Sequence, residues 1–281
     1  MNLRRTSAAV ALTLTAASLA ACGSSTDSAG GSGGGATGGS GGDSIKVGIK
    51  FDQPGMGLKS GADYTGFDVT VAKYIAQKLG KTPQFVEAVS SQRETLIQSG
   101  QVDYIVGTYS ITDARKAKVD FAGPYFIAGQ DLLVRSDETG ITGPDALAGK
   151  KLCSVKGSTS ASNLKKKVPD VQLQEYNTYS ACATALVNGS VDALTTDNTI
   201  LAGYASQNTF KGKLKLVGKT FSTENYGVGL KKGDTELCNK ITDALKSFIS
   251  DGSWQKAVDA NLSPSGFKPG EGNPPTPAAC S

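Results

Sequence analysis

The residues best suited to binding a charged ligand lie where helices are expected to begin. Arg115 falls in the first turn of a short helix opened by Thr112 and Asp113. A guanidinium fork beside unpaired helix N–H groups suits a carboxylate. The alternative is a solvated arginine in the basic run of residues 115–118. The spacing alone favours that alternative.

Polar residues at two other helix starts are also candidates. Asp197 follows a strand expected at residues 191–195, and doubly wound sheets bind ligands beyond the carboxyl ends of their strands. Thr159 and Ser160 open another expected helix. All three residues also fit plain N-caps, and capping does not exclude ligand binding.

Two more cations stand close to expected element ends. Arg93 lies near the start of its helix, where the macrodipole disfavours a positive charge unless an anion lies beside it. Lys50 ends the first expected strand, although a solvated surface lysine fits that place equally well. Ser90 is a candidate neutral donor beside them.

Composition excludes several chemistries. The 281 residues include no histidine, which excludes Ser–His–Asp triads, imidazole bases and His-containing metal sites. Lys and Arg number 29 against 25 Asp and Glu, a net charge of +4, which is too mild for a protein that coats nucleic acid. The cysteines show no CxxC spacing. We expect a binding protein with no catalytic residues, metal, cofactor or nucleic-acid partner.

Alternating strand and helix patterns position these residues. From Ser44 onward the alternation is typical of a mostly parallel sheet with helices on both faces. Ser91 and Glu94 form a capping box that predicts the start of one helix. The expected strands are residues 45–49, 83–88, 102–106, 151–155, 171–175 and 191–195, and the expected helices are residues 68–79, 91–100, 160–167, 179–187, 198–206 and 235–249. A segment around residues 254–262 follows the last helix.

The pattern restarts near residue 150, which predicts two lobes. Extended stretches at residues 131–135 and 226–230 bracket the second unit, and we interpret them as crossings between lobes. Lobe 1 then comprises residues 44–133 and 227–281, and lobe 2 comprises residues 134–226.

The cysteines fit an exported protein. Setting Cys22 aside leaves four, an even number that indicates disulfides and allows three pairings. Cys153 and Cys182 both lie in the expected lobe 2, whereas Cys238 and Cys280 both lie in lobe 1. This map favours disulfides Cys153–Cys182 and Cys238–Cys280, with four unpaired buried thiols as the alternative.

Residues 1–21 have the parts of an export signal peptide. Arg4 and Arg5 precede an apolar core that is too short to span a bilayer. Leu19-Ala20-Ala21-Cys22 is similar to the lipobox of bacterial lipoproteins, which implies a lipidated Cys22 as the first mature residue. A signal cleaved at an A-x-A site just before Cys22 is the alternative.

Residues 22–43 are expected to hold the lipidated cysteine and a flexible linker. Residues 23–42 contain ten Gly and five Ser, and such a stretch has too little apolar surface to order itself. The folded part would therefore stand off the outer face of the cell membrane, anchored by acyl chains.

Three motifs resemble the solute-binding components of amino-acid ABC importers. Gly66-Phe67-Asp68-Val69 is similar to that family's signature after the first strand, residues 96–126 follow its central motif, and residues 191–197 match its second-lobe motif. Residues 50–54 and 92–98 look most like the glutamate-binding members. The resemblance covers residues 44–262. It implies an α/β, two-lobed type 2 periplasmic-binding-protein fold, with a mostly parallel sheet flanked by helices in each lobe and two crossover strands.

The resemblance also implies roles for the candidate residues. The carboxylate and ammonium of an α-amino acid both need charged partners on leaving water. Arg115 would bind the α-carboxylate, Asp197 would pair with the ammonium, and Arg93 with Lys50 would set side-chain specificity. The implied ligand-binding set is Lys50, Ser90, Arg93, Thr108, Ser110, Arg115, Thr159, Ser160, Thr196 and Asp197.

Charge and one departure from the family pattern bear on the ligand. Arg115, Arg93 and Lys50 against Asp197 leave a charge of +2, which favours glutamate or aspartate; glutamine beside an unpaired Arg93 would cost on the order of 1–3 kcal/mol. Many family members stack an aromatic near the proline after the first strand. Residues 53–56 hold none, so Phe51 or Tyr64 is the candidate ring.

We therefore expect a monomeric, lipid-anchored receptor that captures L-glutamate or L-aspartate between its lobes and delivers it to the permease subunits of an ABC importer. Glutamine or another polar amino acid is the nearest alternative ligand. A dehydratase of the same fold is a more distant alternative, as is a sensory lobe for a partner kinase.

Overall fold

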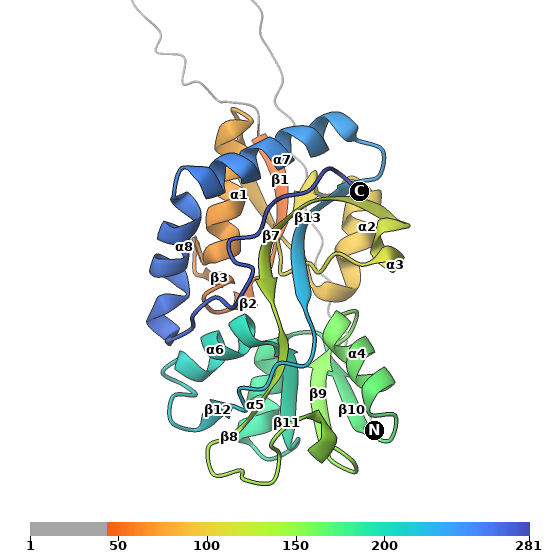
Figure 1. Cartoon of the computed structure of the whole chain (residues 1–281), viewed down its shortest axis with the longest axis vertical. Coiled ribbons are helices and arrows are strands. Elements are labelled where there is room, and N and C mark those ends of the chain that lie inside the picture. Colours follow the sequence, from red (N-terminus) through yellow and green to blue (C-terminus); the bar gives the residue numbers. More distant parts are fainter. Residues whose placement is uncertain (1–43) are drawn as a thin grey trace, which may run out of the picture. The chain divides into compact units, whose positions relative to one another are not determined.

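The computed structural model describes residues 44–281. The expected signal peptide, the Cys22 lipidation site and the linker lie outside the described residues. Two five-stranded sheets, each with a parallel core, organise the described part (Figure 1).

The first sheet has the strand order β5-β1-β6-β13-β7, and β5, β1 and β6 run parallel. The second has the order β10-β9-β11-β8-β12, in which β10, β9 and β11 run parallel. A small third sheet has the order β2-β3-β4. The strands are β1 (Ser44–Ile49), β2 (Asp52–Gln53), β3 (Gly57–Ser60), β4 (Asp63–Thr65), β5 (Thr82–Glu87), β6 (Tyr104–Ile105), β7 (Val119–Ala128), β8 (Gln130–Arg135), β9 (Lys151–Val155), β10 (Gln172–Tyr176), β11 (Ala193–Asp197), β12 (Leu214–Leu216) and β13 (Glu224–Lys231).

Helices cover both sheets, as the alternating pattern predicts. In the first lobe α1 packs on β1 and β5 and against α7, whereas α2 contacts β6, β7 and β13; in the second lobe α4, α5 and α6 pack on the second sheet. The helices are α1 (Phe67–Lys78), α2 (Arg93–Gln98), α3 (Asp113–Lys116), α4 (Thr159–Lys167), α5 (Tyr179–Val187), α6 (Asn198–Ser206), α7 (Thr235–Ser250) and α8 (Ser253–Asn261), with 3-10 turns η1 (Ser90–Gln92), η2 (Pro144–Ala146) and η3 (Ser263–Ser265). Within residues 44–281, every helix falls short of the length and apolar character that crossing a bilayer requires.

The capping box expected at Ser91 and Glu94 is wrong. Ser91 lies inside the 3-10 turn η1, and α2 begins at Arg93 without a side-chain capping bond. The physical reason is that Ser90, one residue earlier, turns its carbonyl and hydroxyl towards Arg93 and Lys50.

The chain passes between the sheets earlier than expected. β8 belongs to the second sheet and begins at Gln130, four residues before the expected start of lobe 2 at residue 134. β13 pairs with β7 of the first sheet and begins at Glu224, three residues before the expected return at 227. The extended patterns at 131–135 and 226–230 are therefore sheet strands, and the crossings precede them.

The first crossing is tightly packed at Gly129. A Cβ on Gly129 would lie 2.8 Å from Thr220 Cβ, on the returning segment. The Gly129 N–H and carbonyl both bond to Asn198, at the start of α6, at 3.2 and 2.8 Å. The two connecting segments thus lie side by side, and a small residue is needed where they touch.

An aromatic cluster fills the core of the first lobe. Phe67 at the start of α1 packs against Phe126 and Trp254, with ring centroids 5.2 and 5.9 Å apart. The buried Trp254 indole N–H donates to the Tyr125 carbonyl at 2.9 Å, so its polar atom is satisfied.

The C-terminal segment returns to the first lobe along β7. Phe121 and Ser281 exchange backbone hydrogen bonds of 2.9 and 3.2 Å, and Ala278 bridges Gly123. The Asn273 side chain donates to the Ile127 carbonyl at 2.8 Å and accepts from its N–H at 3.0 Å. The tail therefore extends the first sheet beyond β7.

Residues 44–281 contain two disulfides, Cys153–Cys182 within the second lobe and Cys238–Cys280 within the first. They are the pairs that the two-lobe map favours. The first joins β9 to α5, and the second ties the C-terminal segment to α7.

Replacing both Cys153 and Cys182 by alanine should lower the free energy of unfolding by about 3–4 kcal/mol, because the bond closes a loop across a sequence separation of 29. Urea denaturation of the wild type and the double variant measures this difference. An unchanged unfolding midpoint, with the wild-type thiols shown to be oxidised, would contradict it.

Candidate functional site

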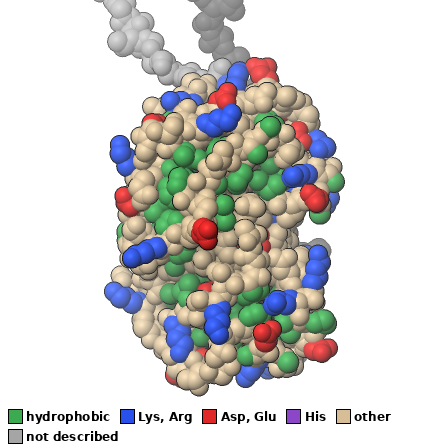
Figure 2. Space-filling view, in the orientation of Figure 1, with side chains coloured by type: hydrophobic (Ala, Val, Ile, Leu, Met, Phe, Trp, Pro, Cys, Tyr) green, Lys and Arg blue, Asp and Glu red, His purple; other side chains and the backbone are tan. Residues whose placement is uncertain are grey.

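The predicted site residues lie at the carboxyl ends of the parallel strands of both sheets. Lys50 follows β1, Ser90 follows β5, and Thr108 and Ser110 follow β6 in the first lobe. Thr159 follows β9, and Asp197 ends β11 in the second lobe. The surface in Figure 2 is hollowed at its right edge, between the upper and lower lobes. The carboxyl ends of the strands of the two sheets thus face each other, and this end of an open α/β sheet is where ligands bind.

Arg93 is buried in a cage of carbonyl oxygens. It is 2% exposed, and its Nη1 donates to the carbonyls of Gly107 and Thr108 at 3.1 and 3.2 Å. Its Nε donates to the Ser90 carbonyl at 3.3 Å, and Nη2 reaches Gly157 of the second lobe at 3.5 Å. Within residues 44–281 these hydrogen bonds all end on neutral acceptors, so the cation is solvated by dipoles rather than by a carboxylate.

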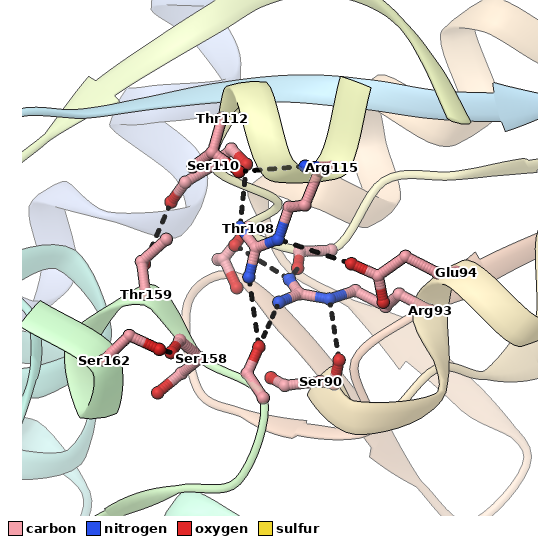
Figure 3. A network of polar contacts seen from close by, with 12 residues as sticks. Ser90, Arg93, Glu94, Thr108, Ser110, Thr112, Arg115, Ser158, Thr159 and Ser162 are labelled. Carbon is pink, nitrogen blue, oxygen red and sulfur yellow. Dashed lines mark hydrogen bonds and ion pairs between the residues drawn. The ribbon is translucent and has the colours of Figure 1, made fainter. Parts of the chain in front are cut away.

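Arg115 converges on the same Gly157 carbonyl from α3. Its Nη2 donates to Gly157 at 3.1 Å and its Nη1 to the Ser110 carbonyl at 2.7 Å, while Nε lies 3.5 Å from Glu94 (Figure 3). The Thr112 hydroxyl accepts from the Arg115 N–H, which confirms that Thr112 opens this helix. Burial, and next the neighbouring Arg93, lower the pKa of Arg115 to about 10.

The ring of Tyr109 contacts both guanidinium groups. The Arg93 and Arg115 guanidinium carbons lie 4.2 and 4.9 Å from the centroid of its ring, within the range of cation–π attraction. Phe51 and Tyr64, the rings expected to stack on the ligand, have centroids 5.3 Å apart and lie beside Lys59, and their contact with a ligand stays a prediction. Tyr109 is therefore the ring that contacts the predicted cations, and the sequence analysis missed it.

Lys50 is a third buried cation. It is 4% exposed and its Nζ donates to the Ser90 hydroxyl at 2.8 Å. Burial, and next the positive charge of Arg93, lower the pKa of Lys50 well below its usual value. The surface-lysine alternative is wrong.

A buried layer in the first lobe fixes Thr108. Its backbone is in the left-handed region, with φ 45°, which is strained for a residue other than glycine. Its N–H donates to Asp68 at 2.8 Å, and the Tyr125 hydroxyl donates to the other Asp68 oxygen at 2.8 Å. Burial raises the pKa of Asp68 to about 7, against these bonds, which lower it. The network turns the Thr108 carbonyl towards Arg93.

Gly66, in the resemblance motif, is what lets Asp68 reach this layer. Its φ is 123°, and a Cβ there would lie 2.2 Å from the Met56 carbonyl oxygen. Only glycine fits this turn into α1.

Gln53 is a buried amide next to this layer. The Thr108 hydroxyl donates to Gln53 Oε1 at 3.1 Å. Its Nε2 has no hydrogen-bond partner within residues 44–281, although the side chain is fully buried. An unpaired buried amide nitrogen is costly, so Gln53 is a functional candidate that the sequence analysis missed.

Asp197 lies on the second-lobe side. The Tyr226 hydroxyl donates to its Oδ2 at 2.6 Å, and Ser160 donates to Oδ1 at 3.4 Å. Although Asp197 stands at the N-cap position of α6, its side chain makes no capping bond there. Burial, and next the buried carboxylate of Glu224, raise the pKa of Asp197 to about 7. A nearby cation would relieve both effects.

The remaining predicted residues join the lobes or line the second. Thr159 and Ser110 contact across the lobes, hydroxyl to hydroxyl, at 3.3 Å (Figure 3). Thr196 is buried, and its hydroxyl lacks a hydrogen-bond partner among the described residues. Ser158, rather than Thr159 or Ser160, caps α4. All ten predicted residues are thus buried or half-buried around the meeting of the two lobes.

The charges of the site are separated rather than simply in excess. The sequence-based count of +2 omitted Glu94, which pairs with Arg115, and the buried Asp68 and Glu224. Lys50, Arg93 and Arg115 gather at the first-lobe strand ends with Asp68 and Glu94 near them, whereas Asp197 ends a strand of the second lobe, next to Glu224 at the start of β13. This arrangement suits a ligand whose own positive and negative groups are separated.

Comparison with known proteins places the chain in a family. The family model of bacterial extracellular solute-binding proteins, family 3, matches residues 45–263. The glutamate-binding protein GluB of Corynebacterium glutamicum is 45% identical over 245 residues, covering 82% of each chain. The glutamine-binding protein GlnH of Bacillus subtilis is 41% identical over 219 residues, covering 76% of this chain and 79% of that protein.

A solved structure shows the same fold. An ancestral arginine-binding protein bound to arginine is 36% identical, with a TM-score of 0.74, and the match covers 78% of this chain and 98% of that one. With the family model matched over residues 45–263 and relatives of this similarity, the chain belongs to the bacterial extracellular solute-binding proteins, family 3.

Proposed function

We propose that this protein captures an acidic amino acid, glutamate or aspartate, between its two lobes and delivers it to an ABC importer. The observation that carries the proposal is that the buried guanidinium groups of Arg93 and Arg115 both donate to one carbonyl oxygen of the second lobe, that of Gly157. Of the two, Arg93 is bonded only to neutral oxygens among residues 44–281. A dicarboxylate would supply the counter-charge that Arg93 lacks and would give Arg115 a second carboxylate beside Glu94.

Each group of the ligand then has a partner. The α-carboxylate binds Arg115, with Ser110, Thr108, Thr159 and Ser160 as neutral donors, and the ammonium pairs with Asp197. The side-chain carboxylate binds Arg93 and Lys50 beside Ser90. Because these residues come from both lobes, their contacts form together only when the lobes close, and the ligand shifts the equilibrium towards the closed form.

Glutamine is the second candidate ligand. A relative 41% identical to the chain is named a glutamine-binding protein. Lys50, whose pKa burial lowers, and the Ser90 hydroxyl offer donors to a neutral amide oxygen. Burying Arg93 beside a neutral amide is the cost of this alternative.

The proposal includes the location of the receptor. The signal-like residues 1–21 and the lipobox-like residues before Cys22 support export and acylation of Cys22, which would anchor a monomeric receptor to the outer face of the cell membrane. We assign it no enzymatic activity. A turnover assay with cyclic dienyl substrates tests the dehydratase alternative.

Calorimetric titration after unfolding and refolding, which removes carried-over ligand, tests the specificity. Arg93→Ala should weaken glutamate binding about 10- to 100-fold, because a charge-assisted pair with the side-chain carboxylate is lost. Arg135→Ala is the matched control, since Arg135 also donates to two carbonyls, of Leu186 and Val191, but lies outside the site. Equal affinities for glutamine and glutamate, both unchanged in Arg93→Ala, would contradict the proposed specificity for acidic amino acids.

The pH dependence of binding tests the ammonium partner. Burial raises the pKa of Asp197 to about 7, and an ammonium beside it would lower that pKa. Ligand binding near pH 6.5 should therefore release protons, and affinity should rise with pH through about 7. Asp197→Asn should lose this proton release and weaken binding about 10- to 100-fold.

Titrations at pH 6.5 in two buffers of different ionisation enthalpy measure the released protons. Asp131→Asn is the control, because burial also raises the pKa of Asp131, whose carboxylate accepts only from backbone N–H groups of its own lobe. Equal proton release from the wild type and Asp197→Asn would contradict the assignment.

A further inference from the structure

We propose that Asp52 is a latch that stabilises the closed form of the protein directly, lobe to lobe, without contacting the ligand. The inference rests on the proposed function, because it concerns the lobe closure that sets the affinity of that site. It adds a determinant of affinity that acts equally on every ligand.

The Asp52 carboxylate belongs to the first lobe but takes its hydrogen bonds from the second. β2 pairs with β3 at Asp52–Leu58 and Gln53–Gly57, which fixes the Asp52 backbone to the first lobe. Oδ2 accepts from the N–H groups of Tyr179 and Ser180, at 2.9 and 3.3 Å.

A third donor comes from a second helix of the same lobe. The Tyr204 hydroxyl, on α6, lies 3.2 Å from Asp52 Oδ2 and also contacts the Asp52 carbonyl oxygen. One carboxylate therefore connects β2 to both α5 and α6.

The position of the carboxylate matches what the start of α5 needs. The first N–H groups of a helix have no partner within the helix, and the macrodipole favours a negative charge there. Thr178, the N-cap of α5, accepts from the Ala181 N–H and leaves the N–H groups of Tyr179 and Ser180 to Asp52. When the lobes separate, these groups and the carboxylate return to water, so the bonds favour only the closed form.

The same interface contains a close backbone approach. A Cβ on Gly203 of α6 would lie 2.1 Å from the carbonyl oxygen of Pro54, two residues after Asp52. Any side chain at residue 203 would push α6 away from the first lobe. Gly203→Ala therefore tests the latch from the second lobe, without altering the carboxylate.

Population-shift arithmetic gives the latch a measurable signature. The apparent dissociation constant rises as the closed, binding-competent fraction falls, by the same factor for every ligand. A direct ligand contact would instead change the ratio of affinities between ligands. The ratio of two dissociation constants thus separates a latch from a contact residue.

The experiment compares Asp52→Ala, Gly203→Ala and the matched control Asp63→Ala, an exposed carboxylate of β4 in the same small sheet. Calorimetry measures binding of glutamate, aspartate and glutamine. Dyes on Lys166→Cys and Lys256→Cys, exposed residues of the second and first lobes, report the closed fraction of the empty protein by energy transfer.

Asp52→Ala and Gly203→Ala should each raise the dissociation constant of every bound ligand by a common factor of about tenfold, and should lower the closed fraction of the empty protein. Asp63→Ala should change neither. A changed ratio between ligands would make Asp52 a ligand contact and overturn the proposal, as would an unchanged affinity and closed fraction in Asp52→Ala.

These outcomes are distinguishable from failure of the proposed function. If the protein binds glutamine or another amino acid rather than glutamate, the common factor is measured with that ligand. If none of the three binds, the closed fraction of the empty protein still decides whether Asp52 holds the lobes together.

Discussion

Two buried guanidinium groups meet at one carbonyl oxygen of the opposite lobe, and much of the surrounding structure serves to keep them there. Arg93 and Arg115 both reach Gly157, and both guanidinium groups contact the ring of Tyr109. Two like charges are tolerable at this depth because carbonyl dipoles and a π-face surround them and because Glu94 pairs with Arg115. The strained backbone of Thr108, held by Asp68, supplies one of those carbonyls.

The fold provides this arrangement by bringing loop ends from two separate sheets together. Each sheet has a parallel core whose strand ends carry the polar residues. The chain enters the second sheet at β8 and returns to the first sheet at β13, and both strands run antiparallel to their neighbours. The three cations lie in the first lobe, whereas Asp197 lies in the second. The separation of charge in the site is therefore a property of the meeting of the lobes, not of either sheet.

The sequence patterns predicted those helices, strands and helix caps that interactions between residues close in sequence determine. Alternating hydrophobic segments predicted nearly all the helices and the six parallel strands, but not β7, the longest strand. The helix start at Thr112 was confirmed because its capping bond is made within one turn. The capping box at Ser91 failed because tertiary contacts of Ser90 turned that segment into a 3-10 turn. The crossings were misplaced because an extended segment carries no signal for the sheet that it joins. Tyr109, Gln53 and Glu224 were missed because their partners lie in other elements.

Both ends of the described chain belong to the first lobe. Ser44 begins β1, and Ser281 exchanges backbone bonds with Phe121 on β7, beside the Cys238–Cys280 disulfide. The second lobe is inserted in the chain of the first and is joined to it by two adjacent connecting segments, near Gly129 and Thr220. A mechanical load applied through these two ends would be carried by the first sheet and would leave the second lobe unstressed.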